Sequence, residues 1–123
     1  MKEAAVVVDK QGRPLHWHIP TNRTGVALPD SRPLWDVLWE HREALGGVAH
    51  SHPGSGIPGP SHEDVTTFEA VEKGLGRRLD WWISSSNHLV LVRWVGPGPF
   101  NYRVEELVTN EPLWLGRLRK ESV

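Results

Sequence analysis

The sequence contains no cysteine, so disulfides are excluded and any metal site must use nitrogen and oxygen ligands. The net charge is only −1, which gives no electrostatic reason to expect binding to nucleic acid or to an anionic membrane. No apolar run approaches the length of a membrane span, and no signal-peptide pattern opens the chain. These absences favour a cytoplasmic protein with no nucleic-acid or membrane partner, and they leave its oligomeric state open.

Tryptophan, in contrast, is abundant, with seven residues in a chain of 123. This length allows a sizeable hydrophobic core and favours a single domain over residues 1–123. Most of the tryptophans are expected in that core, and one or two at a surface that contacts a partner.

The order of apolar patterns and turn residues predicts an α/β fold, with a single mixed β-sheet flanked by helices. Helices are expected at 33–45 and 61–75, and residues 112–123 are expected to form either a docking helix or a frayed tail. Strands are expected at 4–9, 14–19, 25–28, 47–50, 79–84, 88–94 and 100–104.

Three local features refine this prediction. Gly46 and Gly47 are expected to end the first helix and to start the next strand. Trp35 and Trp39 belong to the apolar stripe of that helix and are expected in the core. The segment His16-Trp-His18 is interpreted as an exposed strand face, because no helix bearing a carboxylate follows it.

The stretch from 50 to 64 is where residue types typical of a divalent-metal site are concentrated. His50 and His52 project from the same face of a strand, so both imidazoles can reach one ion. A turn-rich loop of glycine, proline, serine and one isoleucine follows, and Asp64 then lies in the first turn of a helix. Two imidazoles and one carboxylate, with a fourth position for water, form the ligand set of a catalytic zinc site.

Both halves of this stretch can also be explained without a metal site. The pair Ser61 and Asp64 also matches a capping box, a device that starts a helix. His-x-His pairs arise by chance in a chain that has seven histidines. Their combination in one short window favours metal binding, because metal sites need clusters of ligands.

The segments His50-x-His52-Pro and Ser61-x-x-Asp64 resemble the signature of the JAMM/MPN+ (JAB/MPN domain) zinc metalloproteases. That signature consists of His-x-His-Pro, a short spacer, Ser-x-x-Asp and a glutamate far upstream. Eight residues lie between His52 and Ser61, whereas the family usually has seven. The resemblance covers roughly residues 3–95 and implies an MPN (cytidine deaminase-like) type core, although the usual leading helix of the family is missing.

The resemblance implies one Zn²⁺ per chain, bound by His50, His52 and Asp64. It also implies that the hydroxyl of Ser61 stabilises the oxyanion of the reaction. Two histidines and an aspartate suit zinc best, while iron, cobalt and manganese remain alternatives.

The general base is expected to be Glu3, because the glutamate of the family stands just before an apolar strand. Glu40, Glu43 and Glu63 are the other candidates; the first two are expected in solvent, and the third is close to Ser61 in sequence. Val6 occupies the position where the family often has a glycine.

The expected activity is that of a zinc-dependent peptidase or isopeptidase, in which water attacks an amide or isopeptide carbonyl. By resemblance, the substrate would be the C-terminal Gly-Gly of a ubiquitin-like or sulfur-carrier protein. Two alternatives are a non-catalytic MPN-type interaction scaffold and a metal-assisted hydrolase of small amides.

Overall fold

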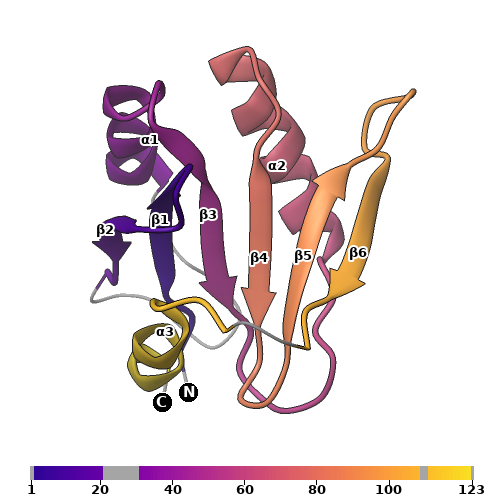
Figure 1. Cartoon of the computed structure of the whole chain (residues 1–123). Helices are drawn as coiled ribbons and strands as arrows, with labels where there is room; N and C mark the ends of the chain where they lie inside the picture. The colour runs from indigo at the N-terminus through magenta and orange to yellow at the C-terminus, as the bar shows by residue number, and fades with distance from the viewer. Residues whose placement is uncertain (1, 21–30, 109–110, 123) are drawn as a thin grey trace.

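The computed structural model describes residues 2–20, 31–108 and 111–122, which form six strands and three helices (Figure 1). The elements in chain order are β1 (Ala5–Asp9), β2 (Pro14–His18), α1 (Ser31–Glu40), β3 (Leu45–Ser51), α2 (His62–Leu75), β4 (Asp80–Ser84), β5 (Leu89–Trp94), β6 (Tyr102–Glu106) and α3 (Leu115–Glu121).

The six strands form one mixed sheet in the order β2-β1-β3-β4-β5-β6. Strands β3 and β4 run parallel and are connected through α2, while every other neighbouring pair is antiparallel. The predicted α/β fold with one mixed sheet is therefore confirmed. None of the helices in the described residues is long and apolar enough to cross a membrane.

Helices cover both faces of the sheet, and strand β1 shows how its sequence allows this. Ala5 and Val7 pack in the core beneath α1 and α2, whereas Val6 and Val8 pack against α3 on the other face (Figure 1). Successive side chains of a strand point to opposite faces, so a strand covered on both sides has to be apolar throughout. Of the two alternatives for the C-terminal segment, the docking helix is therefore correct, and Leu118 of this helix is fully buried.

The predicted end of the first helix is wrong. Helix α1 ends at Glu40, and Leu45 is the first residue of β3, so Gly46 and Gly47 lie inside the strand. A Cβ atom on Gly47 would lie 1.7 Å from the carbonyl oxygen of Asp80 in β4. The glycine is therefore required by the close approach of two strands, not by the end of a helix.

Two predictions about burial are also wrong. The side chain of Trp39 is 47% exposed; it stacks on Trp35 with the ring centroids 6.2 Å apart, and Trp35 itself is only half-buried. His18 is buried rather than exposed, because it pairs with Ala5 on the sheet face that α1 and α2 cover. The predicted strand at 25–28 lies outside the described residues.

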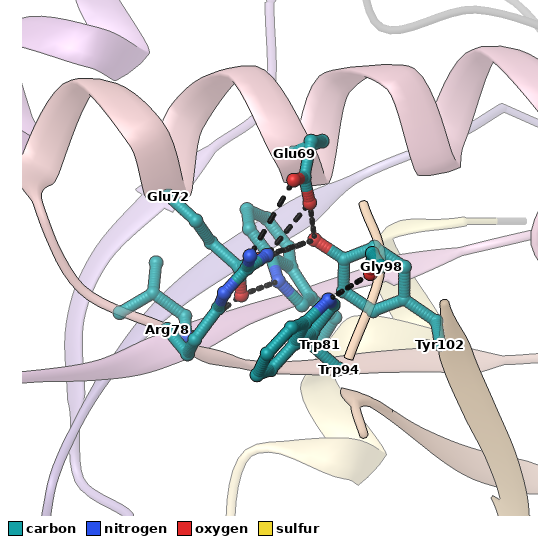
Figure 2. A network of polar contacts seen from close by, with 8 residues as sticks. Glu69, Glu72, Arg78, Trp81, Trp94, Gly98 and Tyr102 are labelled. Carbon is teal, nitrogen blue, oxygen red and sulfur yellow. Dashed lines mark hydrogen bonds and ion pairs between the residues drawn. The ribbon is translucent and has the colours of Figure 1, made fainter. Parts of the chain in front are cut away.

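A buried carboxylate connects α2 to β4 and β6 (Figure 2). Glu72 is 2% exposed, and it accepts hydrogen bonds from the backbone N–H of Leu79 at 2.7 Å and from the indole of Trp81 at 3.0 Å. Arg78 donates to it at 3.0 Å, and the hydroxyl of Tyr102 donates to it as well. Burial and the Glu72 carboxylate raise the pKa of Tyr102, so that hydroxyl remains a donor. Helix α2 is therefore fixed to the sheet by polar contacts as well as by apolar packing.

Replacing this carboxylate is expected to destabilise the fold. The Glu72→Ala variant leaves buried donors on Leu79 and Trp81 without acceptors, so we expect the free energy of unfolding to fall by about 2–4 kcal/mol. Urea denaturation followed by tryptophan fluorescence measures this loss. Glu69→Ala, which removes a partner of Arg78 nearer to solvent, is the matched control and should cost less. Equal losses in the two variants would contradict the role assigned to Glu72.

Candidate metal centre

Pairing between β1 and β3 brings Glu3 beside the two histidines of the 50–64 stretch. Ala5 lies opposite His50 in the antiparallel register. Two hydrogen bonds join Ala4 and Ser51. The backbone N–H of Ser51 donates to the carbonyl of Ala4 at 3.0 Å, and the backbone N–H of Ala4 donates to Ser51 Oγ at 2.9 Å. One residue further along, Glu3 meets His52 on the same face as His50.

The two imidazoles converge at the carboxyl end of β3. His50 is the penultimate residue of the strand and His52 follows the strand directly. Their Nε2 atoms are 3.0 Å apart. His50 is buried, and its ring packs against Phe68 of α2 with the centroids 6.2 Å apart. The two rings therefore converge from the same face of β3.

Asp64 joins the histidines from the first turn of α2. Its backbone N–H donates to Ser61 Oγ at 3.0 Å, and its Oδ2 accepts from Ser61 N–H at 2.9 Å, which completes a capping box. The same carboxylate places Oδ1 at 3.5 Å from His50 Nε2 and Oδ2 at 3.1 Å from His52 Nε2. The carboxylate of Asp64 thus takes part in the capping box and lies beside the imidazoles at the same time.

The separations between these donor atoms suit a small tetrahedral ion. The three closest pairs among His50, His52 and Asp64 lie 3.0, 3.1 and 3.5 Å apart. A tetrahedral zinc ion with bonds of about 2.0–2.1 Å keeps its ligand atoms roughly 3.3 Å apart. The two distances to Asp64 involve different oxygens, Oδ1 toward His50 and Oδ2 toward His52, so both oxygens of the carboxylate lie near the point where the two nitrogens converge.

Glu3 completes the group at a slightly larger distance. Its carboxylate oxygen and a ring nitrogen of each histidine all lie within 4.8 Å of one another, and Glu3 is only 8% exposed. Burial raises the pKa of Glu3, and the two imidazoles act in the opposite direction. The carboxylate can therefore serve as a further metal ligand or as the acceptor for a proton of a water at the fourth position.

Charges at the centre are strongly coupled. Burial acts to raise the pKa of Asp64, but hydrogen bonds from His50 and His52 outweigh it and hold that pKa well below its usual range. The hydrogen bond to Asp64 in turn raises the pKa of His52. A cation is favoured beside this ionised carboxylate, whether it is a proton on an imidazole or a metal ion.

The loop between His52 and Ser61 is held by the turn that joins β4 to β5. Ser86 N–H donates to the Gly54 carbonyl at 2.9 Å. Gly56 N–H donates to Asn87 Oδ1 at 2.9 Å, and the Gly56 carbonyl accepts from Ser85 Oγ at 2.6 Å. Gly54 and Gly56 have φ angles of 109° and 93°, which side chains with a Cβ rarely adopt. With its eight residues, the loop still returns Asp64 to the histidines.

These loop anchors were not predicted as part of the site. Their only signal in the sequence is the polar Ser85-Ser-Asn87 cluster, which predicts a turn but not its partner.

The predicted site residues differ in how close they lie to the centre and in how deeply they are buried. Ser61 is exposed at the N-cap of α2, where its hydroxyl accepts from Asp64 N–H. The alternative bases Glu40, Glu43 and Glu63 are exposed, in contrast to buried Glu3. The clustered groups are thus Glu3, His50, His52 and Asp64, with Ser61 next to them on the helix cap.

Zinc binding tests this centre directly. We expect about one zinc per chain in untagged protein, and we expect His52→Ala to weaken zinc binding by more than about 100-fold, because one of three ligands is lost. Plasma mass spectrometry after dialysis gives the metal content. His62→Ala removes an exposed histidine near Asp64 and should keep the zinc. A wild-type protein that stays metal-free after zinc is supplied would exclude the site.

No protein-family model matches the chain, and no curated protein matches it with significant similarity.

Proposed function

We propose that the protein is a zinc-dependent peptidase or isopeptidase of the JAMM/MPN+ type. One observation carries the proposal: the donor atoms of His50, His52 and Asp64 lie 3.0–3.5 Å apart, with the buried carboxylate of Glu3 beside them. Hydrolytic zinc sites need three such ligands and a base close to the water position.

The arrangement of the chain supports an MPN-type core. The centre lies at the carboxyl end of β3, the first strand of the parallel pair that α2 connects. Ligands in open α/β sheets commonly bind outside the carboxyl ends of such strands. The upstream glutamate of the proposed signature reaches this point because β1 pairs with β3.

A zinc ion held by the three ligands would lower the pKa of a bound water toward ~7 and polarise an amide carbonyl. Glu3 accepts the proton of the attacking water and delivers it to the leaving nitrogen, so the amine departs neutral. Glu3 suits this role because it is buried among the imidazoles, whereas the other candidate glutamates are exposed.

Ser61 is proposed to stabilise the negative charge that develops on the carbonyl oxygen. Its Oγ accepts the hydrogen bond from Asp64 N–H, and its own hydrogen remains available for donation. A donor of this kind typically contributes about 2.7–4 kcal/mol to transition-state stabilisation.

We propose the C-terminal Gly-Gly of a ubiquitin-like or sulfur-carrier protein as the substrate. His50 is only 7% exposed, so the scissile amide has to approach a recessed centre. Residues without side chains make that approach possible, and an extended Gly-Gly tail can lie along the site as an added strand.

The Glu3→Gln variant tests the proposed base. We expect it to keep its zinc and to lose cleavage of Gly-Gly isopeptide conjugates by about 10²–10⁴-fold, because the amide cannot accept the proton. Glu63→Gln, at an exposed position on α2, is the matched control and should cleave normally. Gel-based cleavage assays run beside metal analysis separate loss of the base from loss of the ion.

The outcome of this assay also decides among the alternatives. Undiminished cleavage by Glu3→Gln would remove Glu3 from the mechanism, and loss of zinc in that variant would make Glu3 a ligand. Cleavage of small amides but not of Gly-Gly conjugates would identify a small-amide hydrolase. Zinc-loaded protein that cleaves neither class would favour an interaction scaffold.

A further inference from the structure

A cavity of about 300 Å³ opens beside the metal centre, at the carboxyl ends of β3 and β4. Its walls include Ser51, His52, Pro53, Ser84, Arg119 and Lys120, so one of the proposed zinc ligands separates it from the centre. Arg119 and Lys120 both come from α3, which covers the sheet face opposite α2. The volume is at the lower end of the range for small-molecule sites.

Ser84 is the unusual residue of this cavity. Its side chain is fully buried, and its Oγ is the only buried side-chain nitrogen or oxygen atom of the described residues without a hydrogen-bond partner. Buried hydroxyls are nearly always paired, so an unpaired one that lines a cavity indicates a partner from outside the chain.

The other buried hydroxyls around the cavity, those of Ser51, Ser85 and Ser122, are already engaged, and Ser86 is exposed to solvent. Ser122 and Ser51 bind each other through their Oγ atoms at 2.5 Å, and Ser51 also contacts both backbone groups of Ala4. Ser85 Oγ donates to the Gly56 carbonyl at 2.6 Å and accepts from His88 N–H at 3.1 Å. Among the buried hydroxyls of the described residues that line the cavity, Ser84 is therefore the one left to donate to a ligand.

The charge of the cavity selects the ligand class. Two of its described lining residues are cationic and none is acidic. Arg119 is fixed by hydrogen bonds to the carbonyls of Ser85 and His88, at 3.0 and 3.3 Å, and has an exposed glutamate, Glu111, at 3.7 Å. Lys120 lines the cavity, is exposed to solvent and has no ion pair within the described part of the chain. A hydroxyl donor beside two cations suits an acceptor group with a negative charge.

We propose that this cavity binds a carboxylate, which accepts from Ser84 Oγ and pairs with Lys120. The site is distinct from the metal centre, because it lies on the α3 face of the sheet and adjoins the centre only at His52. Carboxylate binding by the cavity does not depend on the proposed function. The further idea that this carboxylate belongs to the substrate rests on the proposed function.

The binding test uses the full chain stripped of zinc, so that it is independent of the metal centre. N-acetylglycine is titrated into ¹⁵N-labelled protein, with N-acetylglycinamide as the uncharged control. We expect N-acetylglycine to shift amide signals of 51–54, 84–86 and 118–122, and the amide to bind at least roughly fivefold more weakly. Equal binding of the two probes, or shifts elsewhere, would overturn the proposal.

Variants then assign the contacts. Lys120→Gln and Ser84→Ala should each weaken N-acetylglycine binding by roughly fivefold, while Lys73→Gln, at an exposed position on α2, should have no effect. Ser84→Ala should keep or raise the melting temperature, because the hydroxyl it removes has no partner in the fold. A lower melting temperature with unchanged binding would show that Ser84 is structural.

A second arm connects the cavity to the reaction. With zinc restored, N-acetylglycine should inhibit cleavage in the wild type and inhibit the Lys120→Gln variant more weakly. If no cleavage is found at all, the proposed function fails while the binding arm still decides the carboxylate site. If cleavage occurs without inhibition, the cavity is not a substrate subsite.

Discussion

The antiparallel pairing of β1 with β3 is the constraint on which the candidate centre depends. It sets Ala5 against His50, so Glu3 lies on the same sheet face as both histidines although it precedes His50 by 47 positions. A shift of one residue in this register would turn Glu3 to the opposite face, where α3 packs. Buried apolar side chains on both faces of β1 oppose such a shift, since each face has to match its own core.

Contacts at the ends of the chain secure the same register. Lys2 N–H donates to the Ser122 carbonyl at 3.0 Å, and the hydroxyl of Ser122 contacts that of Ser51, which binds Ala4. The segment that carries Glu3 is thereby held between β3 and the end of α3. Helix α3 therefore has a role in the geometry of the centre.

Polar contacts, rather than apolar packing alone, position the remaining parts. The capping box orients Asp64, the β4–β5 turn holds the loop through Ser85 and Asn87, and Glu72 fixes α2 to the sheet. Each of these groups is local to one junction between elements. Together they place the start of α2 beside the carboxyl end of β3.

The sequence by itself determined the α/β class, most strands, the start of α2 and the cluster of His50, His52 and Asp64. These features depend on short-range patterns: alternation along strands, ligand spacing within one window, and the Ser61-x-x-Asp64 cap. The sequence indicates Glu3 only through the resemblance to a family. The tertiary structure decided that its carboxylate lies near the imidazoles, that Gly46 and Gly47 belong to a strand, that Trp39 is exposed and His18 buried, and that Ser84 faces a cavity. Those outcomes depend on which backbone or helix approaches each residue from a distant part of the chain, and no local pattern encodes that approach.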